Sequence, residues 1–108
     1  MKDNIKGGAL TEVTYFILLA LYQPNHGYGI MQFVEQQTNG RLVLGAGTLY
    51  GAINTLAAKN WIAPLSNETT ARKKDYVITA LGKEIIETEV KRLEQAFTLG
   101  RSMIEGIN

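Results

Sequence analysis

The residues of this chain that are best suited to chemistry are cationic. Arg72, Lys73 and Lys74 are consecutive, and guanidinium and ammonium groups gathered in this way neutralise the phosphates of a nucleic-acid backbone. A charge run that is simply solvated is the common alternative. The 108-residue chain has 11 Lys and Arg residues against 10 Asp and Glu residues, a formal net charge of +1. The local run, rather than the total charge, therefore indicates an anionic partner.

Residue types that catalysis and metal binding require are sparse. His26 is the single histidine and there is no cysteine, so one chain cannot supply a multi-histidine or thiolate metal site. The acidic residues are scattered without a pair suited to general acid–base chemistry, and the glycines form no phosphate loop after a strand. We therefore expect no enzyme activity, no metal and no cofactor. His26 is expected to make a polar contact with neighbouring backbone at the start of a helix.

The segment 45–60, in which Lys59 is the single charged residue, offers a second candidate contact surface. Leu49, Ile53 and Leu56 recur at helical spacing and predict a buried stripe, with Ala52 beside them. At about 100° per residue, the opposite face presents small, neutral residues. These are Gly47, Thr48, Gly51, Asn54, Thr55 and Ala58. Such a slim face suits close entry into a DNA major groove, where the Asn54 amide can pair with adenine, although a merely solvated face has the same composition.

Two further residues flank this face. Tyr50 is a candidate for a phosphate contact through its hydroxyl, with a buried ring as the close alternative. Lys59 is a weaker candidate, because a lysine near a helix end is equally explained by the helix dipole. Trp61 is expected to plug the junction between helix and strand, and Tyr28 is expected to pack with its hydroxyl at the surface.

The elements that would position these residues are three short helices, a hairpin and a long helix. Apolar spacing predicts helices over residues 9–21, 26–38 and 45–60, with Asn25 capping the second. Residues 61–65 and 72–79 alternate as two strands with a basic tip, and Pro64 suits an edge strand. From Ala80 the helical pattern returns. This order predicts a mainly α fold with a small β-hairpin, a winged helix-turn-helix.

The last helix carries a repeat of its own, because apolar or small residues recur at intervals of 4, 3, 4, 3 and 4. These residues are Ile86, Val90, Leu93, Phe97, Gly100 and Ile104. This is the rhythm of a coiled-coil seam, which needs a partner helix, and the simplest partner is a second copy of the chain. We expect a DNA-binding region over residues 1–79 and a dimerisation helix over residues 80–108, in one compact unit, with Phe16 in the same dimer interface.

The amino terminus lacks an apolar segment followed by a cleavage site. The longest apolar run, residues 15–22, is far shorter than the roughly 20 residues that cross a bilayer. We therefore expect a cytoplasmic protein without membrane contact.

Specific motifs are similar to those of the PadR family of bacterial transcriptional regulators. His26-Gly27-Tyr28 matches the opening of the family's second helix, and the segment 47–50, Gly-Thr-Leu-Tyr, matches the opening of its third. The segment 72–82 resembles the family's basic wing, tyrosine strand and Thr79-x-x-Gly82 start of the last helix. The chain departs from the family where Gly45-Ala46 replace serine-proline, Gly51 replaces a proline, and Asn54-Thr55 replace a frequent basic pair.

The resemblance implies a homodimeric repressor on a pseudo-palindromic operator in double-stranded DNA. It also implies that a small aromatic or cationic effector binds between the long helices and the core, which would involve Phe16, Phe97 and Met103, unless these residues are plain interface core. Two alternatives remain: a winged-helix protein-interaction module, and a small-molecule sensor without sequence-specific DNA binding.

Overall fold

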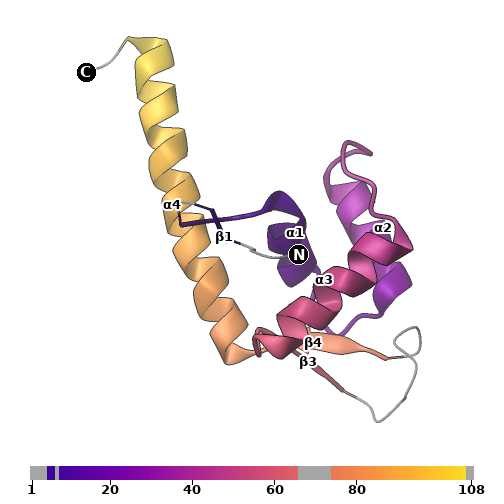
Figure 1. Cartoon of the computed structure of the whole chain (residues 1–108). Helices are drawn as coiled ribbons and strands as arrows, with labels where there is room; N and C mark the ends of the chain where they lie inside the picture. Colours follow the sequence, from indigo (N-terminus) through magenta and orange to yellow (C-terminus); the bar gives the residue numbers. More distant parts are fainter. Residues whose placement is uncertain (1–4, 7, 66–73, 107–108) are drawn as a thin grey trace.

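The computed structural model describes residues 5–6, 8–65 and 74–106. Three short helices and a hairpin form a head, and a long helix extends beyond it (Figure 1). The helices are α1 (Glu12–Ala20), α2 (Gly27–Gln37), α3 (Ala46–Ala58) and α4 (Ala80–Glu105). The strands are β1 (Ile5–Lys6), β2 (Ala9–Leu10), β3 (Ile62–Pro64) and β4 (Tyr76–Ile78). The predicted fold class, mainly α with a small hairpin and a long last helix, is confirmed. No helix in the described ranges has the length and apolar character needed to span a membrane.

The first helix begins later than the apolar spacing predicted. Ala9 lies in β2, which pairs with β1 in an antiparallel hairpin whose turn contains Gly8 at φ +85°. Thr11 is the N-cap of α1, and its Oγ1 accepts a hydrogen bond from the Thr14 amide at 3.3 Å. A capping side chain satisfies an amide that has no partner inside the helix, so the cap rather than the apolar pattern sets the start of α1.

The start of α2 depends on two side chains rather than one. The N-cap is His26, whose Nδ1 accepts a hydrogen bond from the Gly29 amide at 3.1 Å. Asn25 Oδ1 accepts one from the His26 amide at 2.9 Å. The prediction that Asn25 caps α2 was wrong by one residue, because imidazole reaches the first turn equally well. The predicted contact of His26 with neighbouring backbone is confirmed.

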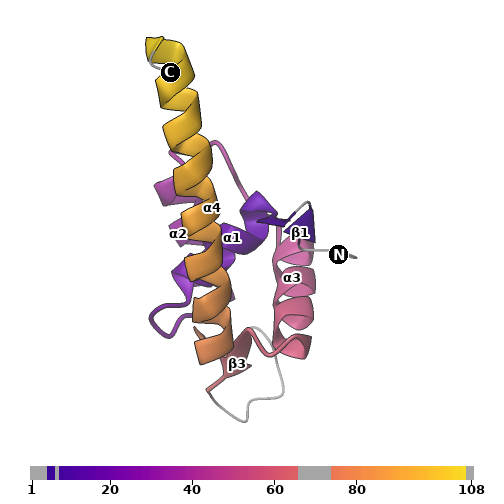
Figure 2. The same ribbon diagram turned by 90° about the vertical axis from the view of Figure 1, so that its left-hand side faces the viewer.

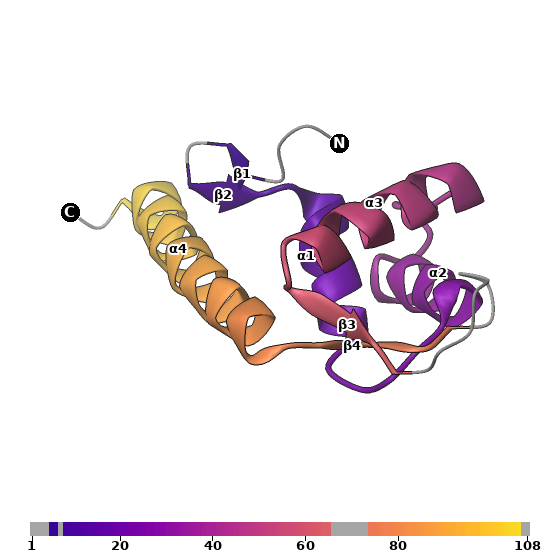
Figure 3. The ribbon, with the colours of Figure 1, turned by 60° about the horizontal axis from the view of Figure 1, so that its bottom comes forward.

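The core lies between α1, α2, α3 and the β3–β4 hairpin, and Figure 3 shows how these elements are arranged. Its largest fully buried side chains are Ile17, Leu18, Leu21, Ile30, Leu49, Ile53, Leu56 and Ile62. Strand β3 pairs with β4 in antiparallel register, Ile62 opposite Ile78 and Pro64 opposite Tyr76. On its other side, β4 exchanges two backbone hydrogen bonds with Asn25. Pro64 therefore lies on the outer strand, as its missing amide hydrogen predicted.

Helix α4 begins directly after the hairpin. Thr79 is its N-cap: the hydroxyl accepts a hydrogen bond from the Gly82 amide at 3.1 Å and donates one to the Asn60 carbonyl at 2.6 Å. The side chain of any larger residue at position 82 would overlap with the Trp61 carbonyl. The Thr-x-x-Gly motif thus fixes α4 against the end of α3.

The amino-terminal half of α4 packs on the head, and the rest extends past it (Figure 2). Gly82, Ile86 and Glu89 are buried, and Glu89 is the last of them. Ile86 belongs to the core of its own chain, with 3% of its surface exposed. Its prediction as a dimer-seam residue is corrected, because the head already covers its side chain. The exposed part of the stripe begins at Val90.

Candidate nucleic-acid interface

Helix α3 has the two faces that its sequence predicted. Leu49, Ala52, Ile53 and Leu56 are buried in the core. Residues on the opposite face are exposed, namely Gly47, Thr48, Gly51, Asn54 and Ala58. Thr55 is half-buried, and its hydroxyl donates to the Gly51 carbonyl at 3.1 Å. Asn54 is thus the amide that this slim face offers to a base edge, while Thr55 is partly engaged within its own helix.

The start of α3 is open. Its N-cap, Gly45, makes no side-chain hydrogen bond, and residues 45–48 are all exposed. Amides in the first turn of a helix have no partner inside the helix, and together with the helix dipole they attract anions. The glycine and alanine that replace the family's serine-proline leave these amides to solvent. This end of α3 suits a backbone phosphate.

Tyr50 lies between α3 and α2. A β-carbon at Gly27 would overlap with the Tyr50 hydroxyl, and the half-buried ring packs on the core. The glycine of the first family motif and the tyrosine of the second are therefore in contact, which ties the two helices of the helix-turn-helix together. The close alternative for Tyr50, a ring packed inside the fold, matches this arrangement. A phosphate contact from the hydroxyl stays a prediction.

Lys59 and Trp61 meet at the end of α3. The Lys59 ammonium lies 4.9 Å from the centre of the Trp61 ring, which is a cation–π arrangement. Trp61 is 7% exposed, so its predicted role as a structural plug is confirmed. Lys59 is half-buried, and its ammonium group already interacts with this ring. A DNA contact from Lys59 stays a prediction.

The wing is described up to its base. The Leu65 amide donates to the Asp75 carbonyl at 2.9 Å, which closes the hairpin beyond the last paired strand residues. Lys74 is half-buried beside this bond. Arg72 and Lys73 lie outside the described residues, so the geometry of the cationic run stays a prediction.

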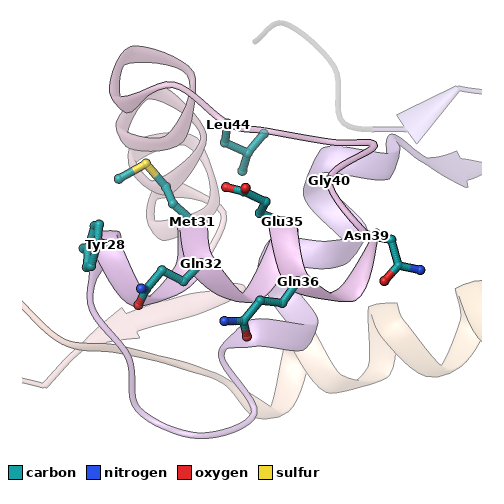
Figure 4. A pocket seen from close by; sticks show the side chains of 8 residues that line it. All are labelled: Tyr28, Met31, Gln32, Glu35, Gln36, Asn39, Gly40 and Leu44. Carbon is teal, nitrogen blue, oxygen red and sulfur yellow. The ribbon is translucent and has the colours of Figure 1, made fainter.

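A groove of about 590 Å³ runs along the outer side of α2 (Figure 4). Met31 and Glu35 point toward Leu44, whereas Gln32 and Gln36 point to the other side of the helix. At one end lies Tyr28, which is 63% exposed. The expectation that the Tyr28 ring packs was wrong, because Gly27 rather than Tyr28 faces α3. Glu35 is the charged residue in this groove, which makes its lining unsuitable for phosphate.

The outer half of α4 exposes most of the predicted seam. Val90 is 45% exposed, Leu93 37%, Phe97 65% and Ile104 79%, and Gly100 is also exposed. Outside this stripe, Met103 is 66% exposed. These apolar side chains are available to a partner helix.

The three candidate effector residues do not line one groove of the described chain. Phe16 is half-buried, meets Tyr15 edge-on at 5.6 Å and lines a groove of about 270 Å³ between α1 and α4. Phe97 lines an adjoining groove of about 390 Å³, which shares Tyr15 and Leu93 with the first, and Met103 lines neither. A site that contains Phe16, Phe97 and Met103 stays a prediction that depends on a second copy of the chain.

Sequence reasoning missed the pair Glu89 and Arg92. Glu89 is 4% exposed, and its carboxylate accepts two hydrogen bonds from Arg92, at 2.8 Å from Nε and 2.6 Å from Nη2. The hydrogen bonds from Arg92 lower the pKa of Glu89, against the effect of burial. One signal was present, since Glu89 follows the buried Ile86 by three residues on the same helix face.

Comparisons with known proteins agree with this geometry. Residues 17–88 match the sequence profile of the transcriptional regulator PadR-like family. A 37.1 kDa protein of transposon TN4556 from Streptomyces fradiae is 41% identical over 66 residues, which are 61% of this chain and 18% of that protein. The chain therefore spans less than a fifth of the length of this relative.

Solved structures share the fold. A PadR family transcription regulator from Clostridium difficile superposes with a TM-score of 0.62 at 27% identity, over 85% of this chain and 95% of that one. A transcriptional regulator from Clostridium thermocellum superposes with a TM-score of 0.68 at 23% identity, over 84% and 90%. Among the described residues, no group of three or more His, Cys, Asp or Glu side chains could hold a metal ion. The chain belongs to the PadR-like family of transcriptional regulators, a family of DNA-binding proteins.

Proposed function

We propose that this chain is a homodimeric repressor that acts in the cytoplasm on a pseudo-palindromic operator. The observation that carries this proposal is the exposed, slim and neutral face of α3, held outward by the buried stripe at Leu49 and Ile53. Each head would place α3 in a major groove, and the half-sites would lie about one helical turn of roughly 34–36 Å, or a multiple of it, apart. Asn54 would read a base, while the first-turn amides of α3 would contact phosphate.

The wing would supply the charge that α3 lacks. Lys74 at the base of the hairpin, together with Arg72 and Lys73, would neutralise phosphates and release counterions. Binding is then expected to weaken steeply as salt rises, with little change in sequence preference when these cations are removed.

The dimer would form through the exposed stripe of α4. A helix with Leu93, Phe97 and Ile104 open to water has an apolar surface that a second copy can cover. A two-fold dimer built in this way presents two heads, which explains why the operator is expected to be pseudo-palindromic.

The central experiment is selection of bound sequences from a random DNA library, followed by anisotropy titrations at several salt concentrations. We expect one enriched half-site, arranged as an inverted repeat. Replacing Arg72, Lys73 and Lys74 by alanine is expected to weaken binding to all sequences and to flatten the salt dependence. The control replaces Lys83 and Lys91, which are exposed on α4, by alanine. Absence of any sequence preference at low salt would contradict the proposal and favour a protein-interaction module.

Small-molecule sensing at the dimer interface is a second candidate, favoured by the exposure of Phe97 and Met103. In a dimer, a partner helix could bring such side chains toward the groove that Phe16 lines. Calorimetric titration of the free protein with a flat aromatic cation, 9-aminoacridine, tests this candidate. Heat of binding that disappears in Phe97→Ala would support it, whereas no heat in the wild type would leave these residues as plain interface core.

A further inference from the structure

Glu89 occupies the position at which α4 leaves the head. It is the last buried residue of the helix, and the next one, Val90, is already 45% exposed. In Figure 2 the upper part of α4 continues beyond α1 with no other element beside it. Whatever holds the helix at Glu89 therefore determines the direction of the remaining residues.

Two elements meet at this carboxylate, α4 and β2. Arg92, one turn further along α4, binds both carboxylate oxygens, and the backbone amide of Leu10 in β2 donates another hydrogen bond. Strand β2 is separated from α1 by the capping residue Thr11 alone. The hydrogen bond from Leu10 thus joins α4 to β2, which leads directly into the first helix of the head.

An apolar residue at position 89 would cover the same part of the head with a smaller desolvation free energy than a carboxylate. Burying a carboxylate is unfavourable unless partners satisfy it, and well-packed apolar residues often replace a buried ion pair without loss of stability. What the carboxylate adds is geometry: Arg92 holds it in place on α4, and its hydrogen bond from the Leu10 amide tolerates less sliding and tilting of α4 against β2 than a contact between methyl groups. A helix held by apolar packing alone would have more freedom of angle against β2.

A small change in this angle has a large effect at the dimer interface. Residues 90–105 extend about 24 Å beyond Glu89, given a rise of about 1.5 Å per residue. A tilt of about 10° would move the far end by about 4 Å, which is close to the rise of about 3.4 Å between successive base pairs. In a dimer joined through this segment, the same tilt would shift each head relative to the other.

We propose that Glu89, held by Arg92 and the Leu10 amide, fixes the angle between α4 and the head and thereby the half-site spacing that the dimer accepts. Glu89 is then a positioning residue, because it acts through the geometry of the heads and touches no DNA. This inference rests on the dimeric DNA-binding function proposed above.

The first test measures the distance between the heads without DNA. The chain has no cysteine, so Gln37→Cys, exposed at the end of α2, gives one spin label per head. Double electron–electron resonance should show a narrow distribution in this labelled protein. Adding Glu89→Leu should shift or broaden it by several ångströms, Glu89→Gln should have a smaller effect, and Glu84→Gln, exposed on α4, should have none. An unchanged distribution in both Glu89 variants would overturn the inference.

The second test measures DNA binding to operators whose half-sites are moved apart in steps of one base pair. The wild type should bind one half-site spacing most tightly. In Glu89→Leu the spacing of tightest binding should move by at least one base pair, or all spacings should be bound about equally. Binding to a single half-site should stay unchanged. If Glu89→Leu does not fold, as judged by circular dichroism, the spacing preference of Glu89→Gln is used instead. A preference equal to that of the wild type would then overturn the inference.

The two proposals fail in different ways. A spacing preference equal to that of the wild type in a dimeric variant would overturn only the role of Glu89. A wild type that is monomeric by light scattering, or that binds DNA without sequence preference, would overturn the proposed function and this inference with it.

Discussion

At the scale of single residues, Asn54 is the side chain of α3 that we propose reads a base. Its neighbours on the exposed face have small side chains, and the Thr55 hydroxyl is engaged with the Gly51 carbonyl. A bidentate amide contact with adenine contributes roughly 1–3 kcal/mol of discrimination. Specificity that rests on one amide is open to loss by a single substitution.

We therefore expect Asn54→Ala to weaken binding to the selected operator by roughly 5- to 150-fold, which corresponds to about 1–3 kcal/mol, and to relax the preference at one base position. Anisotropy titrations against the operator and against single-base variants measure both effects. Gln37→Ala, also exposed but on α2, is the matched control. Equal affinity of Asn54→Ala and the wild type for the operator would show that α3 does not read this base through Asn54.

Glu89 gives the stability of the fold a pH dependence. Its pKa is lowered in the folded state, mainly by the hydrogen bonds from Arg92, so the folded state favours the charged carboxylate. The stabilisation is then fully present above the pKa of the unfolded chain and is lost as the pH falls through the lower, folded pKa.

Urea unfolding monitored by circular dichroism between pH 7 and pH 3 measures this effect. We expect the free energy of unfolding to fall with decreasing pH, and to fall less in Glu89→Gln, which cannot ionise. The exposed pair of Glu12 and Arg41 lowers the pKa of Glu12 as well, so Glu12→Gln separates the two contributions. Parallel curves for the wild type and Glu89→Gln would contradict the assignment to Glu89.

Sequence alone identified the residues that follow from periodicity and missed those that follow from tertiary contact. The buried stripe of α3 was predictable, because apolar side chains at helical spacing form the face of a helix that packs on the core. The burial of Trp61 at the end of this helix was predictable as well. Burial of Glu89 was missed, because its helical spacing from Ile86 is a weak signal for a carboxylate, which is expected at the surface unless its partners in β2 and α4 are known. The exposed ring of Tyr28 was missed for the same reason.

At the scale of elements, the two helices of the helix-turn-helix are held by a contact between a glycine and a ring. The missing side chain of Gly27 makes room for the Tyr50 hydroxyl, and Gly29 makes room for Asn25 in the same way. These glycines are therefore needed for close approach, whereas Gly51 has open space around it. Close contacts thus require glycine at positions 27 and 29, whereas no contact among the described residues requires it at position 51.

This difference gives paired predictions. Gly27→Ala should destabilise the fold, typically by about 1–3 kcal/mol for an overpacked site, and Tyr50→Leu should recover part of the loss in the double variant. Gly51→Ala should instead stabilise the fold by roughly 0.5–1 kcal/mol, because alanine favours a helix interior over glycine. Chemical denaturation of all four variants tests both claims. Equal destabilisation by Gly27→Ala and Gly51→Ala would be inconsistent with the contact.

The junction before α4 depends on Thr79, whose hydroxyl caps the helix and binds the Asn60 carbonyl. Thr79→Ala should cost about 0.5–2 kcal/mol of stability, as N-cap replacements do. Thr79→Ser keeps the hydroxyl and should recover most of the loss in the same denaturation experiment. If serine is as destabilising as alanine, the methyl group rather than the hydroxyl is responsible.

Element order was predictable from sequence, and element ends were less so. All four helices and the β3–β4 hairpin follow from periods of about 3.6 and 2 in the apolar residues. The start of α1 was misplaced because Ala9 fits the helical period by chance, while the cap at Thr11 and the pairing of β2 with β1 depend on hydrogen bonds that the period does not contain. The short β1–β2 hairpin gave no periodic signal at all.

At the scale of the whole molecule, the proposed dimer depends on the exposed half of α4. We expect Phe97→Glu to give a monomer at concentrations where the wild type is a dimer, because a charge in an apolar seam must be desolvated. Light scattering at micromolar concentration measures the mass. Lys91→Glu, exposed on the opposite side of α4, is the charge-bearing control and should stay dimeric. A dimeric Phe97→Glu protein would place the interface elsewhere.

The hydrogen bond between the Leu65 amide and the Asp75 carbonyl has a consequence for protein engineering. It closes the frame of the hairpin at its base, so the segment between these two residues can change in length at a modest entropic cost, about 0.6 kcal/mol for a doubling. A longer or more basic segment grafted between Leu65 and Asp75 should leave the core and α3 in place. With the function proposed above, affinity for DNA can therefore be redesigned in the wing separately from the Asn54 amide that is proposed to read a base.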